Sequence, residues 1–280
     1  MQNDNIEKKR EGKVIFIDWG SYIFRAIFSF EKTRAMPASF TCMSSIIAGL
    51  KKVGVGSNDT IIVAVDSKKG SWRKRYDKAY KAGRKDAREK HDIDWTEIFA
   101  EFDDLKERLK VATPFHILEW DFCEADDIIS VGARYYPDRE VVIMSPDHDF
   151  FELTQLSNVK IFSPLKKYKS KKSSYIKVSN PYKELSKKIQ SEASDGLDAP
   201  IVTEADYELR KKLVSLIELP EDVEAPAKVL FDNIREDKEY DLRLLPFRTI
   251  QERFPQIYDK KDVIDYEACI KYKKKVRRKK

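Results

Sequence analysis

Short apolar runs alternate along this chain with segments in which apolar residues recur at helical spacing. The runs have the length and the β-branched content of buried strands, and they are VIFID (14–18), IIVAVD (61–66), FHILE (115–119), VVIMS (141–145) and VKIF (159–162). Between them, helical spacing predicts helices over 38–53, 94–112 and 124–136. Because strands and helices alternate, we predict an α/β fold with a mostly parallel central sheet flanked by helices.

The strand pattern weakens after residue 163. Residues 166–188 are predicted to form an exposed loop that leads into a helix at 183–191, and residues 203–219, which precede Pro220, are predicted to form another helix. The last ten residues, KYKKKVRRKK, have too few apolar side chains to fold alone. The predicted parts are a polar extension (1–12), an α/β core (13–165), a basic loop with a helical C-terminal lobe (166–270) and a basic tail (271–280).

Acidic residues occur where the predicted strands and helices end or begin. In open parallel sheets, ligands bind beyond the carboxyl ends of the strands. Asp18 and Asp66 close two predicted strands and Asp147 follows a third, so we expect these three carboxylates at one edge of the sheet. The full set is Asp18, Asp66, Glu124, Asp126, Asp127, Asp147, Asp149, Glu192 and Asp195.

Such a cluster of carboxylates predicts bound cations. Carboxylates that lie close together raise each other's pKa, and cations offset their repulsion. Oxygen ligands without His or Cys favour Mg²⁺, for which Mn²⁺ substitutes. One aspartate at a strand end is usually a helix cap or a turn residue. The combination of nine is what points to a metal-dependent nuclease.

Positive charge is concentrated in three segments. Residues 68–90 carry 11 Lys and Arg against three acids, residues 166–188 carry nine Lys against one acid, and residues 271–280 carry eight Lys and Arg against none. These segments together carry +24, and because the net charge of the chain is +6 the other residues carry −18. Any one segment is typical of a solvated lysine-rich face, but all three beside an acidic pocket suit a polyanion such as nucleic acid.

The segment WRKRYDKAYKAGRK (72–85) mixes basic and aromatic side chains. Aromatic rings stack on unpaired bases while Lys and Arg follow phosphates, so this combination is typical of proteins that bind single-stranded nucleic acid. The alternative is an amphipathic helix with its Trp and Tyr side chains packed beneath it. The residues predicted to contact nucleic acid are Arg25, Arg73, Arg75, Tyr80, Lys81, Arg84, Lys85, Lys166, Lys167 and Lys169.

The composition excludes several classes of protein. No segment has the roughly 18 to 20 consecutive apolar residues of a membrane span, and the polar start lacks the apolar core of a secretory signal. There is no P-loop, GxGxxG or GxSxG motif, which excludes nucleotide hydrolysis, dinucleotide redox chemistry and serine esterase chemistry. We expect a cytoplasmic monomer that does not associate with membranes.

Four segments occur in an order that resembles a known family. They are VIFIDWGSYIFRA (14–26), VAVD with WRKRYDKAYKAGR (63–84), EADD (124–127) and SPDHDFFELTQL (145–156). Over residues 13–220 the chain resembles the 5′-nuclease family, which includes flap endonucleases and the 5′-exonuclease domains of bacterial DNA polymerases. Within that family it is most similar to the phage RNase H type, notably in its YKxxR block, its DHDF stretch and NVKIFSP (158–164).

The resemblance implies roles for individual residues. Asp66, Glu124, Asp126 and Asp147 would bind a first metal ion, while Asp18, Asp149 and Asp195 would surround a second, with Asp127 and Glu192 nearby. Two ions together activate water, orient the scissile phosphate and neutralise the leaving oxygen. The resemblance also implies an arch over the active site at residues 68–110. There, Lys81 and Arg84 would contact the scissile phosphate and act in catalysis, and Tyr80 would stack on a base.

The chain departs from the family pattern near its last two predicted ligands. Glu192 stands where the family has Asp, and no Gly follows Gly196, so the family's glycine-rich hairpin for duplex binding is missing. The lysines of residues 166–188 are expected to contact the duplex instead.

We therefore predict a metal-dependent 5′ to 3′ nuclease of the RNase H or flap endonuclease type. It would hydrolyse phosphodiesters near the 5′ ends of RNA:DNA hybrid, nicked or flapped duplexes. In this way it would remove primers during DNA replication. If the protein is phage-encoded, we expect it in the host cytoplasm. The alternatives are a catalytically silent structure-specific DNA-binding protein and a single-strand-specific ribonuclease. The basic tail would anchor nucleic acid or, alternatively, dock a replication protein such as a single-stranded DNA-binding protein or a sliding clamp.

Overall fold

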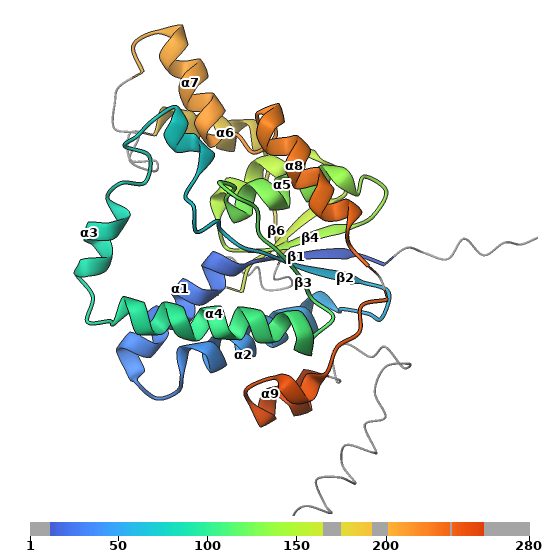
Figure 1. Ribbon diagram of the computed structural model, residues 1–280. Coiled ribbons are helices and arrows are strands. Elements are labelled where there is room, and N and C mark those ends of the chain that lie inside the picture. The colour runs from blue at the N-terminus through green and yellow to red at the C-terminus, as the bar shows by residue number, and fades with distance from the viewer. Residues whose placement is uncertain (1–11, 165–174, 192–200, 236, 255–280) are drawn as a thin grey trace, which may run out of the picture.

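The computed structural model describes residues 12–164, 175–191, 201–235 and 237–254, and strands from these ranges form one six-stranded sheet in the order β3-β2-β1-β4-β5-β6 (Figure 1). Neighbouring strands are parallel, except that β6 runs antiparallel to β5. They are β1 (Val14–Asp18), β2 (Thr60–Ala64), β3 (His116–Leu118), β4 (Val141–Met144), β5 (Val159–Phe162) and β6 (Tyr175–Ile176). The predicted α/β fold is confirmed.

Helices cover both faces of this sheet (Figure 1). On one face lie α1 (Trp19–Thr33), α2 (Ala38–Val53), α4 (Trp95–Ala112) and α9 (Arg248–Arg253), packed into one apolar cluster. On the other face, α5 (Ala125–Tyr135), α8 (Glu221–Asp232) and the 3₁₀ helix η2 (His148–Gln155) form a second cluster. None of the helices in the described ranges is both long and apolar enough to cross a membrane.

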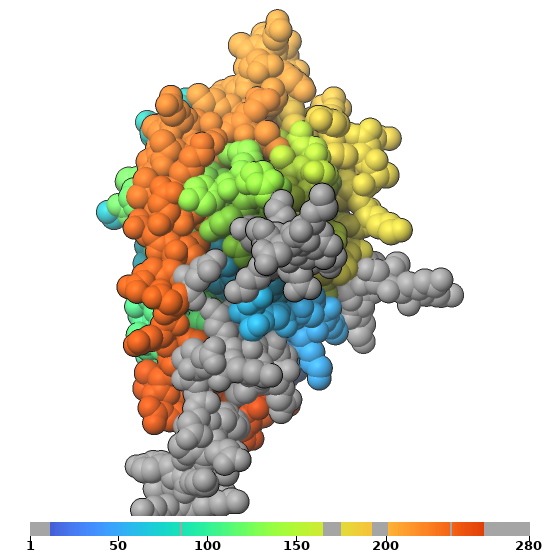
Figure 2. All heavy atoms as spheres, turned by 90° about the vertical axis from the view of Figure 1, so that its right-hand side faces the viewer, coloured from blue at the N-terminus to red at the C-terminus, as the bar shows by residue number. Residues whose placement is uncertain are grey.

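Helix α5 lies very close to the sheet because residue 132 is glycine. A Cβ atom on Gly132 would lie 2.3 Å from the Phe16 ring and 2.7 Å from the Phe231 ring. Those two rings meet edge to face at 6.2 Å, so α8 also packs beside α5, as Figure 2 shows along one side of the molecule. This close packing fixes the position of the N-terminus of α5 relative to the sheet.

Between β2 and α4 the chain extends away from the sheet. This segment contains the 3₁₀ helix η1 (Trp72–Arg75) and α3 (Arg84–Glu89), and in Figure 1 α3 stands apart from the sheet and its flanking helices. The returning residues are tied to α1, since His91 Nδ1 lies 3.0 Å from the Glu31 carboxylate and Arg34 Nη2 lies 3.2 Å from the Asp92 carboxylate. Of the predicted arch (68–110), residues 68–94 lie in this segment, whereas residues 95–110 belong to α4, which packs in the apolar cluster of α1 and α2. The arch and the predicted domain boundaries stay predictions.

The C-terminal half differs in detail from the sequence prediction. Helices α6 (Pro181–Gln190) and α7 (Glu204–Val214) are present, but the helix predicted over 203–219 ends early. It ends because Ser215 Oγ and the Leu216 backbone N–H donate hydrogen bonds to the buried Glu152 carboxylate, at 2.6 and 2.8 Å. Part of the predicted loop instead forms β6, and the short 3₁₀ helix η4 (Leu242–Leu244) precedes α9.

Candidate active site

Three predicted acidic residues lie at the carboxyl edge of the sheet. Asp18 is the last residue of β1, Asp66 follows β2 by two residues, and Asp147 caps η2 after β4. The strands are parallel and in register, with Asp18 opposite Ala64 and Ile17 opposite Met144, so the three carboxylates converge. Gly20 lies beside the point of convergence, since a Cβ there would be in ordinary contact, at 3.6 Å, with an oxygen of both Asp18 and Asp66.

The N-terminus of α5 contributes a second group of acids. Glu124 is the N-cap and forms a capping box with Asp127, and Asp126 lies in the first turn. These three residues offer carboxylate oxygens that all lie within 4.8 Å of one another. The positive end of the helix dipole faces this group and stabilises its negative charge.

The environment of Asp18 disfavours its charged form when no cation is present. Burial, together with the nearby charges of Asp66 and Asp147, raises the pKa of Asp18 to about 6. Hydrogen bonds from Ser21 Oγ and, at 2.7 Å, from Ser145 Oγ oppose that shift and fix the carboxylate. Sequence reasoning missed both serines, although Ser21 stands three residues after a helix N-cap, where such a contact is common.

Asp66 is held directly against α5. Its Oδ1 accepts a hydrogen bond from the Ala125 backbone N–H at 2.7 Å, which joins the end of β2 to the helix that carries Glu124 and Asp126. Burial, with the charges of Asp126 and Glu124, raises the pKa of Asp66. For Asp126, burial is outweighed by Arg73, Lys81 and Lys188, which lower its pKa.

The carboxylates fit a hard divalent cation. Oδ1 of Asp126 and Oδ1 of Asp127 are buried and accept no hydrogen bond from the described residues, although Arg73 Nη2 lies 2.8 Å from the latter oxygen. No His or Cys side chain joins the described acidic group that could hold a metal ion. Anionic oxygens without a hydrogen-bond donor suit Mg²⁺ or Mn²⁺, whose charge would favour the ionised carboxylates that burial and mutual repulsion disfavour.

Cationic and aromatic side chains from the segment after η1 meet the acids at Glu124. Lys81 Nζ lies 2.6 Å from Glu124 Oε1, and the Tyr80 hydroxyl donates to Glu124 Oε2 at 2.9 Å. Lys81 has a φ of 54°, a left-handed conformation that is uncommon for a residue other than glycine. The local backbone is therefore held in a less favourable conformation where Lys81 contacts the cluster.

An open cavity of about 860 Å³ joins these groups. The acids along its wall are Asp18, Asp66, Asp103, Glu124, Asp126 and Asp147, and the cations include Lys81 and Arg84. Phe24 and Phe99 add apolar surface to the wall. The cavity therefore offers both charged and aromatic side chains to a ligand.

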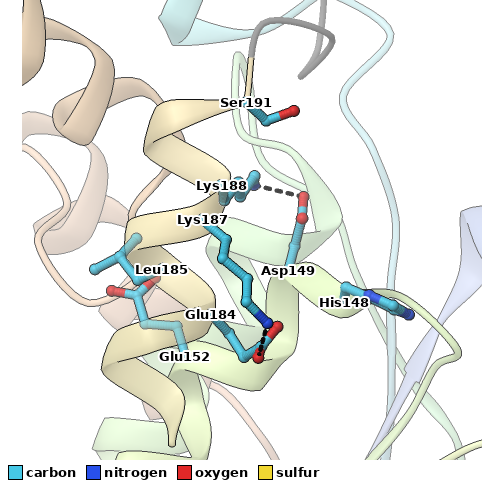
Figure 3. A pocket seen from close by; sticks show the side chains of 8 residues that line it. All are labelled: His148, Asp149, Glu152, Glu184, Leu185, Lys187, Lys188 and Ser191. Atoms are coloured by element: carbon cyan, nitrogen blue, oxygen red, sulfur yellow. Dashed lines mark hydrogen bonds and ion pairs between the residues drawn. The ribbon is translucent and has the colours of Figure 1, made fainter.

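Asp149 faces a separate, smaller cavity of about 320 Å³ between η2 and α6 (Figure 3). Figure 3 shows Lys188 of α6 directed at Asp149, with Nζ 2.6 Å from Oδ2, whereas Lys187 contacts Glu184 of its own helix at 2.7 Å. Burial raises the pKa of Asp149 and Lys188 opposes that shift. Lys188 was not among the predicted site residues.

The residues predicted to contact nucleic acid differ in how much of the side chain is exposed. Arg75 is about half exposed and pairs with Asp222 at 2.6 Å, and Arg25 lies over the Tyr22 ring at 5.4 Å. Arg73 and Tyr80 are only 1% and 2% exposed. The prediction that Arg73 and Tyr80 contact nucleic acid therefore conflicts with the structure, because both side chains are enclosed between α5 and α7.

The side chains of the remaining predicted site residues are not described. Lys85 is in α3, where only its backbone is described. Lys166, Lys167, Lys169, Glu192 and Asp195 lie outside the described residues.

Two comparisons of the sequence with known proteins find matches. Residues 13–185 match the family model of the 5′-3′ exonuclease, N-terminal resolvase-like domain. Ribonuclease H of Enterobacteria phage T4 is 31% identical over 140 residues, which are 49% of this chain and 46% of that protein, so the match spans about half of the relative.

Two solved structures from bacteriophage T5 share the fold. The T5 5′-exonuclease with divalent zinc ions bound is 18% identical with a TM-score of 0.52, over 88% of this chain and 94% of that one. A T5 flap endonuclease variant in a complex with DNA and metal ions is 19% identical with a TM-score of 0.50, over 91% of this chain and 96% of that one. Because the family model matches more than half of its residues, this chain belongs to the 5′-3′ exonuclease family of nucleases.

Proposed function

We propose that this chain is a Mg²⁺-dependent 5′ to 3′ nuclease that removes primers or flaps during DNA replication. Its substrates are RNA:DNA hybrid, nicked or flapped duplexes with a 5′ end. The observation that carries the proposal is the cavity in which five of the predicted carboxylates meet Lys81 and Arg84, in a chain of this nuclease family. The relatives support the substrate class, since one is a ribonuclease H and another is a flap endonuclease in a complex with DNA.

The metal ligands are assigned from this geometry and from the family pattern. Asp66, Glu124, Asp126 and Asp147, which line the cavity, would hold a first Mg²⁺. Asp18, which lines the same cavity, would contribute to a second, to which the family pattern adds Asp149, Glu192 and Asp195, although Asp149 faces the separate cavity beside α6. When bound, two such ions activate water and neutralise the leaving oxygen of a phosphodiester. Mn²⁺ substitutes because it accepts the same oxygen ligands.

The side chains of the chain position the substrate and stabilise its charge. Lys81 and Arg84 line the cavity beside the acids, where they stabilise negative charge that develops on the phosphoryl group. Ser21 and Ser145 hold the Asp18 carboxylate in one orientation. Exposed cations contact phosphates, which carry no sequence information, so the enzyme selects structure and not sequence.

A panel of end-labelled substrates tests this proposal. The purified chain is mixed with Mg²⁺ and 5′-labelled flap, nicked and RNA:DNA hybrid duplexes, beside single-stranded RNA and blunt duplex. The proposal predicts short 5′-phosphorylated products from the first three substrates. Cleavage confined to single-stranded RNA would overturn it in favour of a single-strand-specific ribonuclease.

A further inference from the structure

Arg73 lies within the carboxylate cluster and not on the surface. Its Nη1 donates hydrogen bonds to Glu124 Oε2 at 2.8 Å and to Asp127 Oδ2 at 3.0 Å, and its Nη2 lies 2.8 Å from Asp127 Oδ1. Removing a guanidinium from water is costly unless carboxylates and hydrogen-bond acceptors surround it. Arg73 has these partners inside the protein, so reaching a nucleic acid would mean breaking them.

Asp127 is enclosed on all sides. It is 0% exposed, it accepts hydrogen bonds from Trp72 Nε1 at 3.0 Å and from the Glu124 backbone N–H at 2.9 Å, and it pairs with Arg73. Glu124 and Asp126 line the 860 Å³ cavity, but Asp127 does not. Its oxygens contact Arg73 and Trp72, although one of them lies within 4.8 Å of a Glu124 oxygen and of an Asp126 oxygen.

The same guanidinium reaches a third element. Arg73 Nε donates to the Leu213 carbonyl at 2.7 Å, at the C-terminal end of α7. Beside this contact, Tyr80, Leu213, Val214 and Ile189 of α6 form a small apolar cluster. Arg73 therefore links η1, the N-terminus of α5 and the α6–α7 pair, and α6 leads into the segment that holds Glu192 and Asp195.

We propose that Arg73 is a positioning residue of the metal centre, and that Asp127 is the buried anchor of Arg73 and not a metal ligand. The Arg73 guanidinium holds the Glu124 carboxylate in the orientation that a divalent cation requires. Arginine suits this role because its donors are spread over three nitrogens in a rigid plane and reach two carboxylates and a carbonyl at once, whereas the three donors of an ammonium group share one atom. Partners that orient a metal ligand typically affect metal affinity or activity. The catalytic part of this inference rests on the proposed nuclease function, whereas the binding part does not.

A double-mutant cycle tests the proposal. Mn²⁺ affinity of the nucleic-acid-free full chain is measured by calorimetry for Arg73→Gln, Asp127→Asn and the double variant, and kcat and KM are measured on a 5′ flap. If Asp127 acts through Arg73, each single variant loses about 10- to 100-fold in Mn²⁺ affinity or kcat at unchanged KM, and the double variant loses no more. Losses that multiply in the double variant would make Asp127 an independent ligand and overturn the proposal.

Two further variants keep the result interpretable. Arg134→Gln is the matched control, because Arg134 joins α5 to the Leu216 carbonyl at 2.9 Å and to Glu224 at 3.0 Å, away from the metal ligands. It is expected to lower the melting temperature and leave Mn²⁺ affinity and kcat unchanged, and an equal loss of kcat would overturn the proposal. If Arg73→Gln does not fold, Arg73→Lys takes its place, because it keeps the positive charge but lacks the planar guanidinium. We expect Arg73→Lys to have a lower kcat at unchanged KM.

The outcomes separate this proposal from the proposed function. A rise in KM with unchanged kcat in Arg73→Gln would show that Arg73 contacts nucleic acid, and would overturn the positioning role. If the wild-type chain cleaves none of the substrates, the nuclease proposal fails. The calorimetric cycle still decides whether Arg73 and Asp127 act as one unit in metal binding.

Discussion

Lys81 combines an unfavourable backbone conformation with a contact to a predicted metal ligand. Its backbone φ of 54° is in the left-handed region. For a residue other than glycine this conformation costs about 1–3 kcal/mol, and it persists where the surrounding structure enforces it, often at functional sites. Here the enforcing contact is visible, because Tyr80, the preceding residue, is buried against Leu213 and donates a hydrogen bond to Glu124. The strained backbone thus directs the Lys81 ammonium into the cavity.

Replacing this ammonium tests its role in catalysis. We expect Lys81→Ala to lower kcat about 10²- to 10³-fold and to change KM little, because the lost interaction stabilises charge that develops in the transition state. Steady-state kinetics on a 5′ flap measure both constants. Lys78→Ala is the control, since Lys78 is an exposed lysine of the same segment. A loss confined to KM would refute a catalytic role for Lys81.

The raised pKa of Asp18, about 6, predicts how the metal-free chain responds to pH. Because the folded pKa exceeds the unfolded value, this carboxyl stabilises the fold below about pH 4, and that contribution is lost as the pH rises through about 6. Asp18→Asn removes the ionisation. We therefore expect the melting temperature of the metal-free wild type to fall relative to Asp18→Asn between about pH 4 and about pH 6.5. If the melting temperatures of the two proteins change in parallel with pH over this range, the raised pKa of Asp18 is contradicted.

At the scale of elements, the strands were predictable and several helices were not. Buried parallel strands are continuous apolar runs, so VKIF (159–162) matches β5 residue for residue. Helix α1 was not predicted because Asp18 both ends β1 and caps α1, which leaves no polar break between them. The two-residue strand β6 exists only through its pairing with β5, a tertiary contact without a local signal.

The candidate site likewise combines features that were predictable from the sequence with features that were not. The carboxylates Asp18, Asp66, Glu124, Asp126 and Asp147 were predictable because each follows a strand or begins a helix, and they line one cavity. The burial of Arg73 was not predictable. A basic segment suggests a solvated surface, and only the fold shows that this arginine faces Asp127, 54 residues away in the sequence.

Helix α6 places a lysine where a cation would otherwise bind. Lys188 and Asp149 are 17% and 24% exposed, and an ion pair of this kind contributes about 1 kcal/mol, or about fivefold in an equilibrium constant. We expect Lys188→Ala to bind Mn²⁺ more tightly by about that factor, because the ammonium no longer competes for Asp149. Calorimetry measures the affinity. Lys187→Ala, which breaks only the pair with Glu184, is expected to match the wild type, and unchanged affinity in Lys188→Ala would show that Asp149 binds no cation.

At the scale of the whole molecule, charge is segregated along the chain. The net charge of +6 combines strongly basic segments with an acidic remainder, and the basic tail 271–280 lies outside the described residues. If the tail anchors nucleic acid, removing it should reduce the slope of log affinity against log salt by about 0.7 to 0.9 per lost phosphate contact. Fluorescence anisotropy with a labelled flap measures this slope. An unchanged slope would favour a docking role for the tail.

The central claim is that the converging carboxylates hold the metal ions of a nuclease. The most direct measurement is cleavage of a 5′-labelled flap duplex by the full chain in Mg²⁺, beside Asp126→Asn and beside the wild type with chelator. We predict cleavage by the wild type that is lost in Asp126→Asn and in chelator, while both proteins still bind the flap. Equal binding by both proteins without cleavage in Mg²⁺ or Mn²⁺ would contradict the claim and indicate a protein that binds replication junctions without cutting them.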